Sequence, residues 1–169
     1  MKKLSLISLI LLSLLVIPLS GCGEEKVVEA GDYVKVHYTG TLDDGSVFDS
    51  SEGRDPLAFT AGAGQMIKGF DAAVIGMKVG EEKTVTIPAE DAYGPHDDEL
   101  ILTFTKDELP EGMDPKVDDQ LALTQSNGRQ VRVVVIEVTD KVVVVDANHE
   151  LAGKDLTFEI ELVEITKGK

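Results

Sequence analysis

The sequence predicts an α+β protein in which an antiparallel β-sheet wraps on one short helix and a small β-rich domain is inserted into the chain. Alternating apolar and polar residues, typical of half-buried strands, dominate from Tyr33 onward. Only residues 66–75 show a clear helical pattern. An amphipathic strand at 155–166 follows an acidic stretch, and we expect it to return to the first sheet, which makes that stretch an insertion.

The first half of the chain contains short extended pieces separated by turns. The first strand begins near Tyr33 and has apolar residues at every second position. Asp43-Asp44-Gly45 is a hairpin-type turn, and a loop at 53–56 precedes another extended piece at 57–59. We therefore expect neighbouring antiparallel strands here.

The single helix has one apolar face, and its end is marked by Gly76. The residues on that face are Ile67, Phe70, Ala73 and Val74. A further strand at 82–87 is closed by Pro88. The helix is thus expected to pack against the sheet formed by the flanking strands.

The middle of the chain, residues 96–150, contains 13 acidic and five basic side chains. Three β-runs lie at 120–125, 130–138 and 141–146. The first two are joined by Ser126-Asn127-Gly128 and the last two by Thr139-Asp140, which predicts a β-meander.

The strand predicted at 155–166 has one apolar side, formed by Leu156, Phe158, Ile160 and Leu162.

The first 21 residues predict a signal peptide. They contain two lysines at the start, 13 apolar residues and no acidic residue. An uncleaved anchor helix is the alternative, but the apolar run is shorter than the roughly 20 residues that span a bilayer, and Pro18 lies near its end.

Cys22 is the only cysteine, so an intramolecular disulfide and a cysteine-rich metal site are both excluded. The run Leu19-Ser20-Gly21-Cys22 resembles the lipobox of prokaryotic lipoproteins, in which the cysteine is lipidated and becomes the new N-terminus. This resemblance implies a protein of the cell envelope, lipid-anchored on the extracytoplasmic side of a membrane, with residues 22–29 as a tether. Lasting attachment needs more than one acyl chain.

The acidic net charge of the chain argues against proteins that bind nucleic acid or anionic lipid. The chain has 31 acidic and 16 basic residues, a net charge of −15, and 43% hydrophobic residues. Such an acidic chain is not expected to bind nucleic acid or an anionic lipid surface, while its apolar content is sufficient for a folded core. We expect no cofactor. No metal site is predicted either, because His37, His96 and His149 are far apart, and Asp97-Asp98-Glu99 lacks the spacing of a calcium loop.

Five motifs, in order, resemble those of FKBP-type peptidyl-prolyl isomerases. They are Val36-His37-Tyr38-Thr39-Gly40, Gly45-Ser46-Val47-Phe48-Asp49-Ser50-Ser51, Gly64-Gln65-Met66-Ile67-Lys68-Gly69-Phe70-Asp71, Gly76-Met77-Lys78-Val79-Gly80-Glu81 and Glu90-Asp91-Ala92-Tyr93-Gly94. The insertion after Gly94, followed by the segment 145–158, resembles the SlyD branch of that family. The resemblance implies an FKBP-like isomerase domain at 30–95 plus 147–169 and a substrate-binding flap domain at 96–146.

The resemblance also implies a proline pocket. Its lining would be Tyr38, Phe48, Asp49, Phe59, Met66, Ile67, Phe70, Tyr93 and Phe158, with His149 and Leu151 as wall residues near the insertion. Smaller members often have tryptophan where this chain has Phe70, so the pocket floor should differ in shape. The chain ends at Lys167-Gly168-Lys169 without the His-rich tail of many SlyD proteins, so the metal role is not carried over.

By the same resemblance, the Tyr93 hydroxyl and the Ile67 backbone amide would donate to substrate carbonyls, and Asp49 would polarise the pocket edge without acting as a base. Each residue has a structural alternative. The aromatic residues can be simple core, the tyrosines ordinary buried phenols, and Asp49 the cap of a turn.

The sequence is therefore consistent with three functions. The first is a lipid-anchored prolyl isomerase, expected to be a monomer, that acts on unfolded or proline-containing polypeptides held by the insert. The second is a non-catalytic holdase chaperone with a vestigial pocket, and the third is metal delivery.

Overall fold

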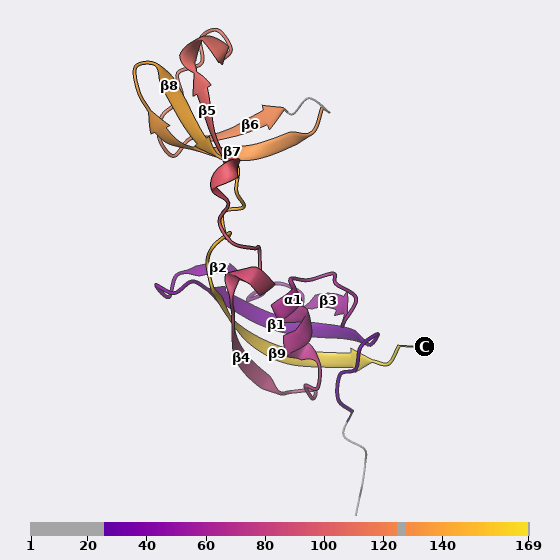
Figure 1. Ribbon diagram of the computed structural model, residues 1–169. Coiled ribbons are helices and arrows are strands. Elements are labelled where there is room, and N and C mark those ends of the chain that lie inside the picture. The colour runs from indigo at the N-terminus through magenta and orange to yellow at the C-terminus, as the bar shows by residue number, and fades with distance from the viewer. Residues whose placement is uncertain (1–25, 125–127, 169) are drawn as a thin grey trace, which may run out of the picture.

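The computed structural model of the protein describes residues 26–124 and 128–168, which form two separate antiparallel sheets (Figure 1). The expected signal peptide, Cys22 and residues 126–127 of the predicted hairpin turn lie outside the described residues. Within the described part of the chain, no helix has the length and apolar character needed to cross a membrane.

The first sheet has five strands, and the last strand of the chain lies inside it. Its strands are β1 (Tyr33–Thr41), β2 (Val47–Ser50), β3 (Leu57–Thr60), β4 (Glu82–Ile87) and β9 (Leu156–Thr166). The order is β2-β1-β9-β4, and β3 pairs with the opening half of β1. Because β9 lies between β1 and β4, its alternating apolar residues are all buried, with Leu156 and Leu162 at 0% exposure.

The helix α1 (Lys68–Val74) is shorter than the predicted 66–75. Ile67 and Ile75, at its two ends, have extended backbone angles, and Gly76 follows with a φ of +83°. The helix buries Phe70, Ala73 and Val74 in the core of the first sheet, as its apolar face predicts.

The second sheet consists of β5 (Ile101–Thr105), β6 (Gln120–Thr124), β7 (Gln130–Val138) and β8 (Val142–Asp146), in the order β5-β8-β7-β6. Its own core contains Val133, Val135, Val143 and Val145. The three predicted runs are present. Strand β5 was not predicted, because it is a short run between two 3-10 turns, η2 (Asp98–Leu100) and η3 (Lys106–Glu108), in an acidic region, and its pairing partner β8 is remote in sequence.

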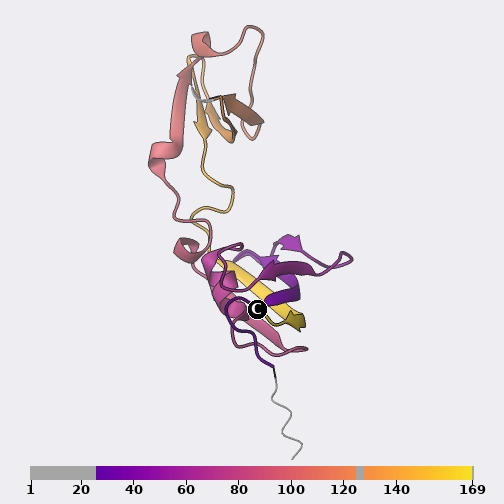
Figure 2. The same cartoon turned by 90° about the vertical axis from the view of Figure 1, so that its right-hand side faces the viewer.

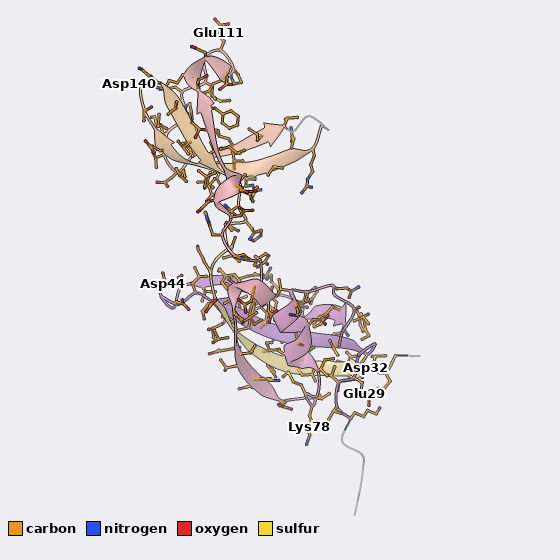
Figure 3. All side chains as sticks on the ribbon, in the orientation of Figure 1. Glu29, Asp32, Asp44, Lys78, Glu111 and Asp140 are labelled. Carbon is orange, nitrogen blue, oxygen red and sulfur yellow. The ribbon has the colours of Figure 1, made fainter. Side chains whose placement is uncertain are left out.

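The second sheet forms a lobe that stands off from one end of the first domain, joined to it by the chain leaving after Gly94 and the chain returning after Asp146 (Figures 1 and 2). Figure 3 shows Glu111 and Asp140 at the far end of this lobe, whereas Glu29, Asp32 and Lys78 lie at the opposite end of the molecule. The exact domain boundaries given above stay a prediction.

Candidate active site

Five aromatic side chains from five elements meet between the first sheet and α1. Phe70 of α1 lies at the centre, with its ring centroid 5.1 Å from that of Phe158 and 5.8 Å from that of Tyr38, both in edge-to-face geometry. The ring centroids of Phe48 and Phe158 are 5.6 Å apart, and those of Phe59 and Phe70 are 5.9 Å apart. Such edge-to-face pairs contribute about 0.5–1.5 kcal/mol each beyond the burial of area.

The cluster has a buried floor and a partly open rim. Phe59, Phe70 and Phe158 are at most 6% exposed, whereas Tyr38 and Phe48 are half-buried. The half-buried Met66 and Ile67 pack against the same core, and Leu151 is buried in it. The structure thus brings together the apolar residues of the predicted pocket.

Gly40 on β1 is required for this packing. A Cβ at this position would lie 2.5 Å from Cζ of Phe48 and 3.0 Å from Cε1 of Phe158. Gly40 ends the first FKBP-like motif, but the sequence does not predict it as a site residue, because a glycine in a strand gives no sign of which rings approach it.

The loop before α1, which carries Met66 and Ile67, is fixed by a buried carboxylate. Asp71 is 7% exposed, and its two oxygens accept hydrogen bonds from the backbone N–H groups of Gly62 (2.7 Å) and Gly64 (2.9 Å). Asp71 was likewise not predicted as a site residue. Its position one turn into the helix lets it hold the loop that borders the pocket.

A polar network lies at the rim of the aromatic cluster. The Tyr38 hydroxyl donates to Oδ2 of Asp49 at 2.5 Å, and Nη2 of Arg54 donates to Oδ1 of the same carboxylate at 2.7 Å. The backbone N–H of Ser50 also donates to Oδ1. Asp49 lies within strand β2, so its carboxylate joins the rim of the aromatic cluster to the backbone of its own strand.

The network fixes the protonation states. Burial, followed by the hydrogen bond to Asp49, raises the pKa of Tyr38 to about 12. The Tyr38 hydroxyl is in turn the main cause of the lowered pKa of Asp49, with Arg54 and Ser50 adding to it and partial burial opposing it. At neutral pH the Tyr38 proton is thus directed to an ionised Asp49. A carboxylate with a lowered pKa is a weak base.

Arg54 is a site residue that the sequence did not reveal. It lies in the loop between β2 and β3, where no periodic pattern marks it. The available signal was composition, because the chain has only three arginines and this one stands five residues after Asp49. Arginine is suited to a carboxylate partner because its guanidinium group stays protonated and its N–H donors lie in one plane.

Tyr93 and His149 form a second group, at the junction of the two sheets. Tyr93 follows the 3-10 turn η1 (Ala89–Asp91), and its ring stacks on that of His149 with centroids 3.9 Å apart and planes 5° apart. Both residues line a groove of about 610 Å³, together with His96 and Asp97. None of the ring contacts among the described residues joins this pair to the five-ring cluster.

The third histidine lies elsewhere. His37 is on the outer face of the first sheet, where its Nδ1 lies 3.0 Å from Oγ of Ser51, and it lines a separate groove of about 590 Å³. In the described ranges, 26–124 and 128–168, no group of three or more histidine, cysteine or acidic residues is arranged to hold a metal ion.

The sequence is similar to proteins of known family over most of its length. Residues 24–163 match the family described as FKBP-type peptidyl-prolyl cis-trans isomerase. The chain is 39% identical over 153 residues to the short-type peptidyl-prolyl cis-trans isomerase of Methanocaldococcus jannaschii, covering 82% of this chain and 94% of the relative. It is 30% identical over 139 residues to the FKBP-type 16 kDa peptidyl-prolyl cis-trans isomerase of Escherichia coli K12, covering 82% and 93%.

A SlyD protein is also similar. The chain is 36% identical over 132 residues to the FKBP-type isomerase SlyD of Aeromonas hydrophila, and this match covers 78% of the chain and 61% of the relative. The chain belongs to the family of FKBP-type peptidyl-prolyl cis-trans isomerases, with SlyD proteins among its relatives.

Proposed function

We propose that the protein catalyses cis–trans rotation of X-Pro bonds in polypeptides, with the proline ring seated on the five-ring cluster. The observation that carries this proposal is the open rim of Tyr38 and Phe48 over the buried floor of Phe70 and Phe158. A cluster of rings that is buried at its base and half-buried at an edge carrying a carboxylate suits a proline ring with a carbonyl on each side.

The reaction needs no bond between heavy atoms to break. A prolyl amide rotates slowly because twisting it sacrifices C–N resonance, a barrier of about 18–20 kcal/mol. In the twisted amide the carbonyl loses part of its negative character, so transfer from water to an apolar, aromatic cavity favours the transition state over the planar ground state. A thousandfold acceleration requires only about 4 kcal/mol.

Polar groups then orient the substrate. In this proposal the Tyr93 hydroxyl donates to one substrate carbonyl and the Ile67 backbone N–H to another. Asp49, neutralised in part by Arg54, polarises the rim and holds Tyr38 in place, and it takes no proton from the substrate. Orientation and desolvation together are sufficient for the modest acceleration required.

We further propose that the inserted lobe binds unfolded polypeptide beside the pocket. It has its own sheet and core, and two connecting segments join it to the isomerase domain near Tyr93. Several apolar side chains on or next to it are exposed, namely Leu100 (40%), Met113 (43%), Val117 (51%) and Ile136 (45%). Binding at the lobe raises the local concentration of chain at the pocket.

We also propose that the protein is a lipoprotein of the cell envelope, anchored through Cys22 and acting as a monomer on proteins that fold outside the cytoplasm. Val27 forms a bridge with Lys78, at the end of the molecule opposite the inserted lobe (Figure 3). Four residues separate Cys22 from Val27, a reach of at most about 18 Å. An anchor at Cys22 would thus direct the lobe away from the membrane. Replacement of Cys22 by serine should then release the protein from the membrane fraction, and continued membrane attachment would contradict the anchor.

The catalytic proposal is tested with two variants of neighbouring residues on β2. Phe48→Ala removes a half-buried ring from the pocket rim, so the rate of isomerisation of a short prolyl peptide should fall about tenfold or more. Val47→Ala alters a side chain that is 59% exposed and should leave the rate unchanged. Equal rates for a folded Phe48→Ala variant and the unaltered protein would contradict the pocket assignment.

The inserted lobe separates this function from the holdase alternative. Replacement of residues 97–146 by a short linker should preserve activity on the short peptide and abolish most of the acceleration of proline-limited refolding. If neither the full chain nor the shortened one isomerises peptides while the full chain still suppresses aggregation, the holdase with a vestigial pocket is the correct function.

A further inference from the structure

The exposed Tyr93 side chain has an ordered position that burial does not explain. Its side chain is 42% exposed, yet its ring lies flat on the imidazole of His149, with centroids 3.9 Å apart. Among the described residues, His149 is the only aromatic partner of Tyr93. An exposed tyrosine without such a partner samples several rotamers, so the stack is what restricts the direction of its hydroxyl.

The imidazole is itself held from the side of the core. The backbone N–H of Leu151 donates to Nδ1 of His149 at 3.1 Å, and Leu151 is 8% exposed. The backbone carbonyl of His149 accepts a hydrogen bond from the N–H of Ala152 at 2.8 Å, which closes a backbone turn over residues 149–152. Because Nδ1 accepts this bond, it carries no proton, and the neutral ring has its proton on Nε2.

The two chain segments that carry the stacked rings are also joined to each other. The N–H of Gly153 donates to the carbonyl of Gly94 at 2.8 Å, one residue after Tyr93. On the other side, Asn148 donates from Nδ2 to the carbonyl of Asp97 at 2.9 Å and accepts from the N–H of Asp97 at 3.0 Å. These bonds prevent the two segments from sliding, so the ring of His149 is a fixed platform for that of Tyr93.

We propose that His149 is the positioning residue for Tyr93: its imidazole holds the phenol so that the hydroxyl is already directed at the substrate carbonyl before substrate binds. This rests on the proposed function, in which Tyr93 donates that hydrogen bond. Pre-ordering the donor removes the entropic cost of fixing it during catalysis. His149 does not contact the reacting amide in this proposal; it acts through Tyr93.

The first test is the proline-peptide isomerisation rate of the full chain. His149→Ala should lower kcat/KM about three- to tenfold, the equivalent of losing one aromatic stack. His149→Phe restores a flat ring without Nδ1 and should recover most of the loss. A loss in His149→Phe as large as that in His149→Ala would assign the effect to the hydrogen bond with Leu151 and overturn the platform role.

The second test asks whether the effect passes through the Tyr93 hydroxyl. In a Tyr93→Phe background, which retains the ring and lacks the donor, His149→Ala should cause little further loss, whereas a general structural defect would lower the rate in both backgrounds equally. An equal loss in both would overturn the proposal.

Ring signals in NMR spectra provide a readout that does not depend on activity. The chain has three tyrosines and no tryptophan, so their ring protons can be resolved. In His149→Ala the Tyr93 signals should move toward those of a free tyrosine while those of Tyr38 stay in place. Unmoved Tyr93 signals would overturn the positioning role. If instead Tyr93→Phe alone is as active as the unaltered protein, the proposed hydroxyl donation fails, and the ring signals still decide whether His149 orders Tyr93.

Discussion

At the scale of single residues, the most informative group is the carboxylate of Asp49, which binds Tyr38 through one oxygen and Arg54 through the other. The Tyr38 hydroxyl cannot donate to this carboxylate and to a substrate at once. The phenol of Tyr38 therefore serves as part of the apolar rim, and its hydroxyl keeps Asp49 ionised. Among the described residues, no carboxylate accepts a hydrogen bond from the Tyr93 hydroxyl, which leaves Tyr93 as the tyrosine suited to donate to substrate.

The Asp49 network makes a prediction about acid stability. Because the folded-state pKa of Asp49 is lowered, mainly by the Tyr38 hydroxyl, its stabilising contribution is present above the unfolded pKa of about 3.9 and is lost as the pH falls through the folded value. In Tyr38→Phe the pKa of Asp49 should rise toward its ordinary value, which an NMR titration of the carboxyl carbon measures. Tyr33→Phe, on the exposed end of the same strand, is the control and should leave that titration unchanged.

At the scale of elements, the position of Phe70 depends on how closely α1 approaches β4. A Cβ on Gly69 would lie 2.3 Å from Cγ2 of Ile87, which is 1% exposed and cannot move into solvent. The helix can therefore lie this near the sheet only with glycine at that position. The distance between α1 and the sheet in turn determines how closely Phe70 approaches Phe158.

Gly69→Ala should therefore destabilise the protein, although alanine is by itself the better helix former by about 1 kcal/mol. The clash with Ile87 should outweigh this gain and lower the free energy of unfolding by about 1–3 kcal/mol, measured by urea denaturation. In an Ile87→Ala background the same substitution should be neutral or stabilising. If Gly69→Ala costs the same in both backgrounds, contact with Ile87 is not the cause.

At the scale of the whole molecule, the link between the two sheets includes an ionisable histidine. His96 lies between them: its Nε2 is 3.0 Å from Oδ2 of Asp146, its Nδ1 is 3.5 Å from Oδ1 of Asp98, and a Cβ on Gly153 would lie 3.0 Å from its own Cβ. The hydrogen bond to Asp146 is the main cause of the raised pKa of His96. The same link holds Asn148, beside the Tyr93 and His149 stack.

The junction should therefore loosen as the pH rises. A raised folded-state pKa means that the contribution of His96 to stability is complete below its unfolded value of about 6.5 and is lost as the pH rises through the folded value. At low pH the contact between His96 and Asp146 is lost when Asp146 becomes protonated. Burial raises the pKa of Asp146, but its hydrogen bonds with Asn148 and His96 outweigh burial, so the pKa is lowered. Amide-exchange protection at Asp97 and Asn148 should therefore fall as the pH rises above about 6.5 and through the raised folded-state pKa of His96. His96→Gln should abolish this change, and His37→Gln, on the outer sheet face, should not.

Much of the fold was predictable because it depends on local periodicity. The alternation in β9 was strong enough to exclude a terminal tail, and the apolar face of α1 was visible in four residues. Strand β5 was not predictable, because five residues between two 3-10 turns gain their strand conformation from pairing with β8. The contact of Gly69 with Ile87 was not predictable either, because it forms only when α1 packs against β4.

The sequence by itself determined the fold class, the family motifs, the acidic character and the apolar faces that pack in the core, since periodicity and motif order are properties of the chain. Only the tertiary structure decided which of these residues act together. It joined Arg54 to Asp49, stacked Tyr93 on His149, and placed His96 between the two sheets. These partners come from distant segments or from irregular loops, where sequence spacing does not specify distance in space.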